Sequence, residues 1–281
     1  MATISPASLT LQLKNIIKLI DLNILAIMIN IAERHQYILN KIQINGSLDV
    51  QSLCKELDVS SVTIRKDLKL LEDKNLLFRT HGGATLNNPY TVDKPVNEKE
   101  HLQSAEKIKI GTLAAELVED NDSIIIASGT TVLALARCIK PKGSLTVITS
   151  ALNVALELVH HSNIEVIQLG GLLRKSSSSV TGPYSDNVLG NVFCSKLFLG
   201  VDGIDLEFGL TTTNAFEAHL NRQMIDASQK IIVLADSTKF GKRGFGRICG
   251  IDEVDHIITD SGVSEHTIKT LESMGIKISI I

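Results

Sequence analysis

Short apolar stretches alternate with helical stretches through the last two thirds of the chain, from about residue 104 to the end. Uninterrupted apolar strands that lie between helices predict a parallel sheet with helices on both faces. We therefore expect an α/β fold, with a Rossmann-like parallel-sheet domain over residues 104–281. The expected strands are residues 123–127, 145–149, 164–169, 196–199, 230–234, 256–259 and 277–280, and the expected helices are residues 105–118, 132–139 and 152–160.

Three of these strands run into turns rich in glycine, serine and threonine. The first turn opens directly into a helix, which would offer free backbone N–H groups and a positive dipole end to an anion. Ligands of open parallel sheets bind beyond the carboxyl ends of the strands, so we expect the turns to converge on one ligand, with Lys239 as a cation. The alternatives are that the hydroxyls only cap helices and that Lys239 is a solvated loop residue. The turn residues are Ser128, Gly129, Thr130 and Thr131, then Thr149, Ser150 and Asn153, then Gly170 and Gly171.

Three short helices are expected nearer the N-terminus. Asp49 is a suitable N-cap for the second helix, and Ser60 or Ser61 caps the third. A tight turn between these two helices makes a helix-turn-helix, and two short strands after it would form a wing. The expected segments are a winged helix over residues 31–86, its helix-turn-helix over about residues 48–67, and wing strands at residues 76–78 and 81–85.

The third helix and the tip that follows it have the chemistry of a DNA-binding surface. Residues 59–83 hold five basic against three acidic side chains, although the net charge of the whole chain is −3. A helix that begins with hydroxyl-bearing and basic side chains suits insertion into the major groove of DNA, while the loop that follows it contacts phosphates. Arg65 is expected to read bases, whereas the lysines and the wing would hold the DNA backbone. The residues expected at DNA are Ser60, Ser61, Thr63, Arg65, Lys66, Lys69, Arg79, His81 and Gly82.

Residues 31–86 resemble the DNA-binding domain of the DeoR family of bacterial transcription regulators. Lys66 departs from the family, which usually has a second arginine there. Lysine keeps the charge but loses the bidentate fork of arginine, which favours phosphate contact over base reading. The matching blocks are Glu33-Arg34-His35, the turn at residues 46–48, Val59-Ser60, Thr63-Ile64-Arg65-Lys66-Asp67-Leu68 and Arg79-x-His81-Gly82-Gly83-Ala84.

The second half resembles the effector-sensing domain of the same family, which is related in fold to ribose-5-phosphate isomerase and glucosamine-6-phosphate deaminase. This resemblance implies a phosphorylated, sugar-like effector. Ala127 departs from the family, because many relatives have an aspartate there, and the identity of the effector stays open. The matching blocks are Ser128-Gly129-Thr130-Thr131, Leu169-Gly170-Gly171, Gly200-Val201-Asp202-Gly203-Ile204-Asp205, Gly209-Leu210-Thr211, Leu234-Ala235-Asp236-Ser237-x-Lys239 and Ile258-Thr259-Asp260.

The relationship to isomerases makes an enzyme the main rival: a sugar-phosphate isomerase or deaminase with a DNA-binding appendage. Asp202, Asp205 and Glu217 would then form a carboxylate cluster, with Glu217 as general base. The isomerases have a Lys-Gly-Gly-Gly loop after their aspartates, whereas residues 208–213 here read Phe-Gly-Leu-Thr-Thr-Thr. Without that cation an oxyanion loses its electrostatic partner. We therefore expect no catalysis, and we expect Asp202 and Glu217 to accept hydrogen bonds from an effector.

Taken together, the sequence predicts a DNA-binding transcription regulator, a repressor of carbohydrate-metabolism genes that binds double-stranded operator DNA. One winged helix buries too little surface for tight binding, so a homo-oligomer, dimer or tetramer, is expected. Aromatic residues are only 4% and tryptophan is absent, which argues against single-stranded nucleic acid. An RNA-binding winged helix is a weaker alternative.

The remaining segments are an N-terminal extension at residues 1–30 and a linker at residues 87–103. The apolar run at residues 22–32 is too short to span a membrane, which takes ~20 residues. It is either an oligomerisation helix or part of an over-extended start with Met28 as the true initiator, the interpretation that we favour. The four cysteines are far apart and form no Cys-x-x-Cys pair, as in a cytoplasmic protein with reduced thiols, and neither a metal nor a cofactor is expected.

Overall fold

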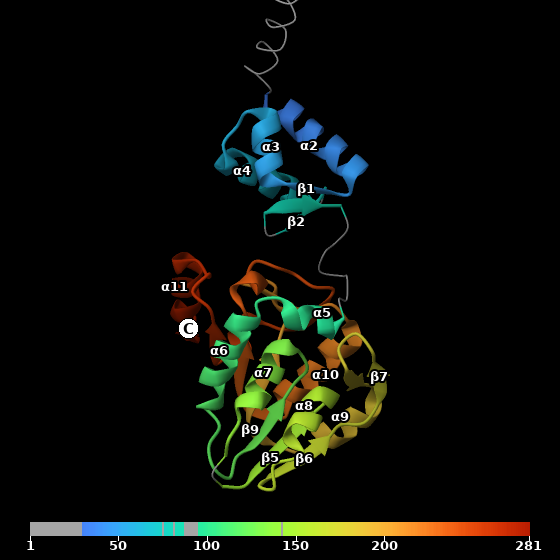
Figure 1. The fold of residues 1–281 in the computed structure, drawn as a ribbon, viewed down its shortest axis with the longest axis vertical. Coiled ribbons are helices and arrows are strands. Elements are labelled where there is room, and N and C mark those ends of the chain that lie inside the picture. Colours follow the sequence, from blue (N-terminus) through green and yellow to red (C-terminus); the bar gives the residue numbers. More distant parts are fainter. Residues whose placement is uncertain (1–29, 75, 81, 87–94, 142) are drawn as a thin grey trace, which may run out of the picture. The chain divides into compact units, whose positions relative to one another are not determined.

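The computed structural model describes residues 30–281 except 75, 81, 87–94 and 142. The chain divides into two compact units, Met1–Pro89 and Tyr90–Ile281 (Figure 1). Residues 1–29 of the expected N-terminal extension, with Met28, lie outside the described residues, whereas residues 30–32 of its apolar run form the N-cap and start of the helix Ile31–Asn45. Within the part of the chain that is described, no helix is long and apolar enough to cross a membrane.

The first unit is a winged helix-turn-helix. Its three helices enclose a small core in which Ile38, Ile42, Ile64 and Leu68 are buried. Beside them lies an antiparallel sheet of three short strands in the order β1-β3-β2. The elements are α2 (Ile31–Asn45), β1 (Ser47–Asp49), α3 (Val50–Leu57), α4 (Ser61–Asp73), β2 (Phe78–Thr80) and β3 (Gly83–Thr85).

Side-chain caps define the helix starts much as expected. The Asp49 carboxylate accepts a hydrogen bond from the Ser52 backbone N–H at 2.9 Å, and the Ser60 hydroxyl accepts one from the Thr63 N–H at 3.2 Å. The second helix begins at Val50, because the preceding residues form β1 through pairing with β3. The outer wing strand is Phe78–Thr80 instead of residues 76–78. The expected start of the second helix after Asp49 is thus confirmed, whereas the shift of the wing strand comes from its pairing with β3, which local sequence does not specify.

A buried ion pair joins α2 to α4. Arg34 donates from Nε to Asp67 Oδ2 at 2.5 Å and from Nη2 to Asp67 Oδ1 at 2.9 Å. His35 Nε2 lies 3.1 Å from the same Oδ1. The hydrogen bond to Asp67 raises the pKa of Arg34. Because a bidentate pair is directional as well as strong, it fixes the rotation of α4 about its axis and so decides which residues of α4 face outward.

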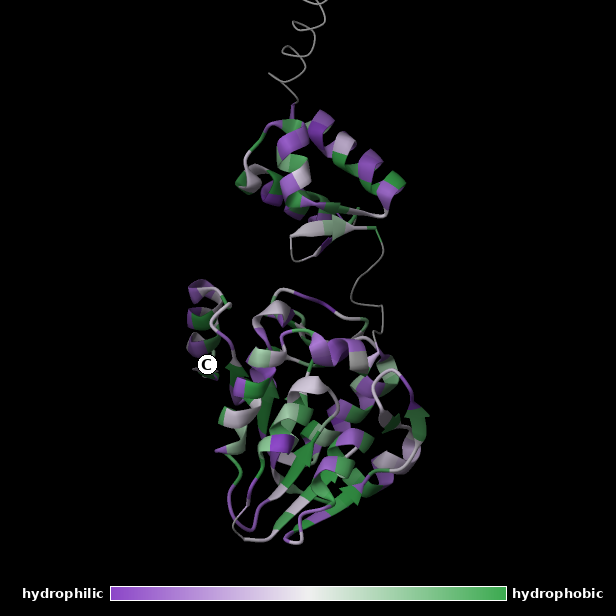
Figure 2. Cartoon of the chain, in the orientation of Figure 1, coloured by the Kyte–Doolittle hydropathy of each residue, from purple (hydrophilic) through white to green (hydrophobic). Residues whose placement is uncertain are grey.

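The second unit is built on a seven-stranded sheet in the order β15-β14-β12-β9-β4-β5-β6, in which every neighbouring pair is parallel. Alternate side chains enter two cores: Ile124 and Phe198 lie in one, and Ile125 and Leu197 in the other. Figure 2 shows apolar residues concentrated in these strands. The expected parallel α/β fold is confirmed. The strands are β4 (Ser123–Ile126), β5 (Leu145–Thr149), β6 (Ile164–Gln168), β9 (Cys194–Gly200), β12 (Ser228–Leu234), β14 (His256–Thr259) and β15 (Lys277–Ile280).

Helices cover both faces of this sheet. Side chains of α6, α7 and α8 enter the first core, and those of α9, α10 and α11 enter the second. The sheet also reverses its order: from β4 the chain builds outward to β6, then returns to β9 and builds the other way. The connections after β4 and β9 therefore diverge and leave a crevice beyond their carboxyl ends. The helices are α6 (Ser104–Ala115), α7 (Thr130–Cys138), α8 (Leu152–Leu158), α9 (Pro183–Leu189), α10 (Ala215–Asp226) and α11 (Glu265–Ser273).

Several short elements of the second unit were not expected. Helix α5 (Val96–His101) lies inside the stretch expected to be a linker. Other short strands pair into a hairpin, β7–β8, and a small sheet, β10-β11-β13. Elements this short are too brief to show a periodicity in the sequence. They form through contacts with other segments of the fold, which the local sequence does not specify. They are β7 (Leu172–Arg174), β8 (Ser179–Thr181), β10 (Gly203–Asp205), β11 (Gly209–Thr212) and β13 (Gly246–Cys249), with one-turn helices η1 (Ser237–Lys239) and η2 (Ile251–Glu253).

Replacing Asp67 by alanine should destabilise the first unit, because the buried Arg34 loses the carboxylate that binds it at two nitrogens. The free energy of unfolding should fall by about 3 kcal/mol, which is at the lower end of the range for a broken buried ion pair because Arg34 keeps some exposure. Hydrogen exchange of the α4 amides in the full chain measures it. The double variant Arg34→Met with Asp67→Leu should exchange much more slowly than Asp67→Ala. Equal rates for the two variants would contradict the assignment of the loss to an uncompensated charge.

Candidate functional site

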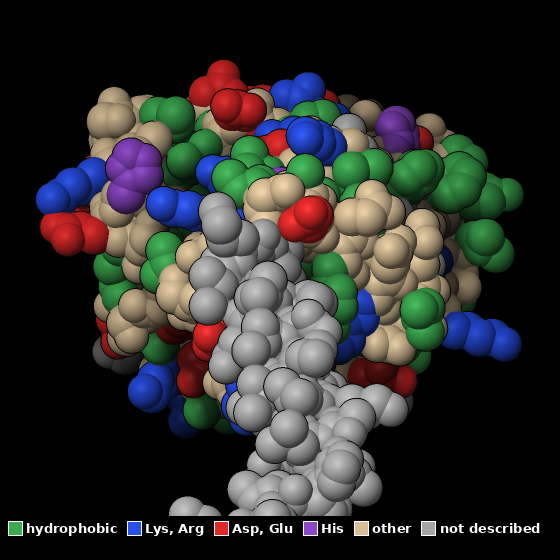
Figure 3. All heavy atoms as spheres, turned by 90° about the horizontal axis from the view of Figure 1, so that it is seen from above, with side chains coloured by type: hydrophobic (Ala, Val, Ile, Leu, Met, Phe, Trp, Pro, Cys, Tyr) green, Lys and Arg blue, Asp and Glu red, His purple; other side chains and the backbone are tan. Residues whose placement is uncertain are grey.

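The expected DNA-binding residues of α4 lie along its exposed surface. Ser61, Arg65 and Lys69 are exposed and recur every four residues, so they share one face of the helix, and Lys66 is exposed beside them. Thr63 is half-buried. In the view of Figure 3, basic side chains are interspersed with acidic and apolar ones. Recognition through α4 would depend on the exposed side chains of its own face, Ser61, Arg65 and Lys69.

The Ser60 hydroxyl is engaged within the helix start. It accepts the Thr63 N–H and lies 3.0 Å from the Thr63 hydroxyl. On the wing, the Arg79 N–H donates to Glu72 Oε1 at 2.8 Å, and the Arg79 guanidinium lies 3.8 Å from Glu72 Oε2. This contact ties the wing to the end of α4. His81 lies outside the described residues.

Each of the two glycines at the wing tip is required for a different physical reason. Gly82 is exposed and has a φ of +106°, a conformation that side chains disfavour. At Gly83 a Cβ would lie 1.9 Å from the carbonyl oxygen of Leu48, so no side chain fits between β3 and β1. The glycine pair therefore shapes the wing.

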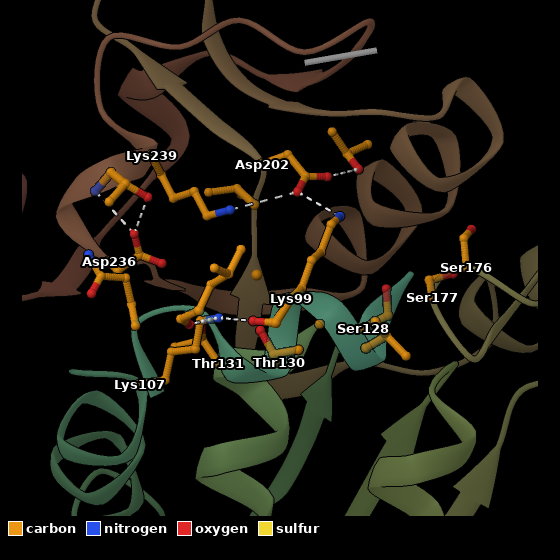
Figure 4. A pocket seen from close by; sticks show the side chains of 18 of the residues that line it. Lys99, Lys107, Ser128, Thr130, Thr131, Ser176, Ser177, Asp202, Asp236 and Lys239 are labelled. Atoms are coloured by element: carbon orange, nitrogen blue, oxygen red, sulfur yellow. Dashed lines mark hydrogen bonds and ion pairs between the residues drawn. The ribbon is translucent and has the colours of Figure 1, made fainter. Parts of the chain in front are cut away.

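A cavity opens in the second unit at the crevice beyond β4 and β9 (Figure 4). It brings together the first expected turn with Asp202, Glu217 and Lys239. Its lining comprises Val96, Lys99, Leu102, Gln103, Lys107, Ser128, Gly129, Thr130, Thr131, Ser176, Ser177, Gly200, Val201, Asp202, Thr212, Glu217, Asp236, Thr238 and Lys239.

The second and third expected turns do not line this cavity. The β7–β8 hairpin lies over the carboxyl ends of β5 and β6, where the Val180 N–H donates to the carbonyl oxygen of Ser150 at 2.9 Å. The Ser185 hydroxyl donates to the carbonyl oxygen of Gly170 at 2.7 Å. These turns are used for packing, so the three turns do not converge. The residues left outside the cavity are Thr149, Ser150, Asn153, Gly170 and Gly171.

Asp202 is the central negative charge of the cavity, and lysines reach it from two sides (Figure 4). Its Oδ1 lies 3.0 Å from Lys99 Nζ and 3.9 Å from Lys239 Nζ, and Thr212 donates to Oδ2 at 3.1 Å. Burial alone would raise the pKa of Asp202, but the charges of Lys99 and Lys239 and the hydrogen bonds outweigh it and lower the pKa below its usual value.

A third lysine, Lys107 of α6, is buried at the cavity wall. Its Nζ donates to the carbonyl oxygens of Lys99 at 2.5 Å and Leu102 at 2.6 Å. Burial lowers the pKa of Lys107 to about 8; the charge of Asp236 opposes the shift, while the nearby lysines add to it. The cavity therefore holds three lysines, of which two lie near the Asp202 carboxylate and one binds two backbone carbonyls.

The start of α7 adds donors to the same cavity. Gly129, with a φ of +131°, precedes the helix, and no described side chain caps it. Uncapped N–H groups at a helix start attract anions. The hydroxyls of Thr130 and Thr131 lie beside them on the lining.

The three carboxylates considered for catalysis are not one cluster. Glu217 accepts hydrogen bonds from Arg174 and from the Ser128 hydroxyl, the latter at 2.7 Å. Asp205 does not line the cavity; it binds Arg243 at 2.8 and 3.0 Å and accepts the Phe208 N–H. Among the described residues there is also no group of three His, Cys, Asp or Glu side chains that could hold a metal ion.

Two family models match the chain. Residues 34–90 match the DeoR-like helix-turn-helix domain, and residues 102–261 match the DeoR C terminal sensor domain. The chain belongs to the DeoR family.

Relatives of this DeoR-family chain match it over nearly their whole length. It is 34% identical over 252 residues to the putative aga operon transcriptional repressor of Escherichia coli O157:H7, covering 89% of this chain and 94% of that protein. It is 36% identical over 251 residues to the uncharacterized HTH-type transcriptional regulator YulB of Bacillus subtilis (strain 168), covering 89% and 97%. The expected DNA-binding transcriptional regulator is confirmed.

Solved structures of sugar-phosphate isomerases resemble part of the chain. Ribose 5-phosphate isomerase A from Methanocaldococcus jannaschii aligns at 14% identity and a TM-score of 0.34, over 48% of this chain and 53% of that one. A likeness this distant says nothing about activity.

Sequence reasoning missed two of the three lysines that line this regulator's cavity. Lys99 lies in a stretch expected to be a linker, and no local pattern marks it. Lys107 did carry a signal: it lies three residues before Ile110 and seven before Ala114, on the buried face of α6. A lysine on an apolar helix face has to find acceptors, so its position could have indicated a polar site.

Lys107→Met should change how stability depends on pH. The folded chain holds the pKa of Lys107 near 8, whereas the unfolded chain restores the ordinary value of about 10.4. Between these values the unfolded chain binds more protons, so Lys107 makes stability rise with pH there. In urea unfolding, the free energy of unfolding of the wild type should rise relative to that of the variant from about pH 8 to 10. A difference in unfolding free energy that stays constant over this range would contradict the lowered pKa.

Proposed function

We propose that this regulator represses genes of carbohydrate metabolism and that a phosphorylated, sugar-like effector in the cavity changes its affinity for operator DNA. The observation that carries the proposal is the convergence of Lys99, Lys107 and Lys239 with the uncapped start of α7 at the reversal of the sheet. A relative named as a repressor of the aga operon supports it. Since its target is DNA, the regulator would act in the cytoplasm.

The DNA-binding half of the proposal rests on the exposed face of α4. Arg65 would read bases in the major groove, with Ser61 and Thr63 near bases or phosphates. Lys66, Lys69 and the wing residues Arg79, His81 and Gly82 would hold the backbone, and Ser60 would act through the cap that starts the helix. One such unit offers a small interface, so we propose that a homo-oligomer binds paired half-sites.

The effector half rests on matching chemistry. A phosphate is a dianion with several acceptor oxygens, which suits helix N–H groups and lysines. Asp202 and Glu217 are acceptors and suit the hydroxyls of a sugar, with Ser128, Thr130 and Thr131 as further partners. The cavity thus offers cations for an anionic group and carboxylates for hydroxyls.

We further propose that the chain does not turn over its ligand. Lysines from other elements supply cations that the loop at residues 208–213 lacks, so the missing loop lysine alone does not decide the question. The state of Glu217 argues against catalysis more directly. Both of its oxygens already accept hydrogen bonds, Oε1 from Ser128 and Oε2 from Arg174, so these contacts occupy the atoms that a general base would use to take a proton.

Arg65→Ala should lose ~1–3 kcal/mol of binding to a duplex that the full chain selects from a random pool. The loss on random duplex DNA should be much smaller, because only a base contact carries sequence preference. Lys74→Ala, at the other end of α4, is the control and should bind nearly as wild type does. Equal losses of Arg65→Ala on selected and random DNA would exclude base reading, and preferential binding to duplex RNA would overturn the DNA assignment.

A panel of ribose 5-phosphate, glucose 6-phosphate, fructose 6-phosphate and glucosamine 6-phosphate should contain at least one ligand that raises the melting temperature. A ligand at ~100 times its Kd adds ~2.7 kcal/mol, or roughly 5–10 °C for a unit of this size. Lys239→Met should weaken that ligand about tenfold or more, since a hydrogen bond to a charged group is lost. The same panel should show no product formation; turnover of any member would establish the enzyme instead.

A further inference from the structure

Helix α5 is both the first element of the second unit and part of the cavity wall. It follows directly on the segment that joins the two units. Val96 and Lys99 of α5, together with Leu102 and Gln103 just after it, line the cavity. A ligand in the cavity would therefore touch the element closest in sequence to the DNA-binding unit.

Cations of the cavity hold the C-terminal end of α5 in place. Lys99 Nζ donates to Asp202 Oδ1 at 3.0 Å. Lys107 Nζ donates to the carbonyl oxygens of Lys99 and Leu102 at the end of the helix, where the Lys99 carbonyl also accepts the Leu102 N–H at 3.3 Å. At the other end, the Val96 N–H donates to the carbonyl oxygen of Ser176 at 2.6 Å. The contacts at the C-terminal end of α5 are thus made by two lysines that line the cavity, Lys99 and Lys107 (Figure 4).

The turn after α5 is strained. Gln103 has a φ of +51°, in the left-handed region that residues other than glycine seldom adopt. It separates α5 from α6 and itself lines the cavity. Such a residue persists only where its surroundings hold it, and here those surroundings include the two carbonyls bound by Lys107.

We propose that α5 transmits occupancy of the cavity to the DNA-binding unit, with Lys99 as a ligand-contacting residue and Lys107 as a positioning residue. The inference rests on the proposed effector site. An anion at the start of α7 competes for both ammonium groups, because a dianion is a stronger acceptor than the backbone carbonyls that bind Lys107 and carries more charge than the single carboxylate that binds Lys99. Lys99 then turns from Asp202, and Lys107 turns from the end of α5.

The consequence is a change in the contacts that hold α5, the element of the second unit that is nearest in sequence to the first unit. In thermodynamic terms, the effector has one affinity for the chain with α5 bound by the two lysines and another for the chain with α5 released. The ratio of these two affinities sets the factor by which the effector can change operator affinity. Such factors are typically about 5–150-fold. A lysine that contacts the effector without belonging to α5 or binding its backbone, such as Lys239, contributes to affinity but not to this factor.

Lys99 and Lys239 form a matched pair for the test. Both line the cavity, both reach Asp202 Oδ1, and their side chains are 25% and 23% exposed. Only Lys99 belongs to α5. Lys99→Met and Lys239→Met are made in the full chain, and affinity for the selected duplex is measured without ligand and at saturation with the best sugar phosphate of the panel. Circular dichroism confirms that both variants are folded.

Both variants should need about tenfold or more ligand to reach saturation, since each loses a charged partner. At saturation, Lys239→Met should recover the full wild-type change in operator affinity, whereas Lys99→Met should retain less than about a third of it. A full change in Lys99→Met, or an equally reduced change in both variants, overturns the inference while leaving the effector site intact.

Hydrogen exchange provides a second readout that needs no DNA, with inorganic phosphate and the same sugar phosphate as probes. Ligand should protect the first-turn amides of α7 and alter exchange of the amides in residues 97–103. Protection at α7 without any change in α5 overturns transmission through α5. No change at either place, together with no thermal shift, refutes the proposed effector site and this inference with it.

Discussion

The reversal of strand order between β4 and β9 is the constraint on which the second unit depends. All strands of a parallel sheet point their carboxyl ends to one edge, but only at a reversal do the following connections diverge and leave room. The connection after β4 opens α7, and that after β9 brings Asp202 to the same place. At β5 and β6 the edge is closed by the β7–β8 hairpin. The position of the cavity therefore follows from topology.

A buried carboxylate at that place determines the charges around it. Asp202 would be costly without compensation, and Lys99 and Lys239 provide it from two elements far apart in the sequence. The cations of the cavity are consequently engaged before any ligand arrives. Ligand binding has to exchange one set of partners for another, and such an exchange can couple binding to a change in structure.

The first unit depends on a comparable buried charge. Arg34 and Asp67 belong to blocks that mark the resemblance to the DeoR family, yet both are buried and face each other. Their pair orients α4, so that Arg65 and Lys69 are exposed on one face. A charged residue in a DNA-binding motif can thus be there to aim the helix instead of to contact DNA.

The sequence by itself determined what depends on neighbours along the chain. Apolar runs marked all seven strands of the main sheet, Asp49 and Ser60 marked helix starts, and Ser128 to Thr131 marked the turn at the cavity. These features depend on local propensity and on capping, which a few adjacent residues specify.

Only the tertiary structure decided which side chains share the cavity. It brought in Lys99 from a stretch without periodicity and Lys107 from an apolar helix face, and it left Thr149 and Gly170 beneath a hairpin. The physical reason is that membership of a site depends on the order of the strands and on how short segments pair across the fold. Turns with similar local chemistry, such as the serine- and threonine-containing turns after β4 and β5, therefore end in different surroundings.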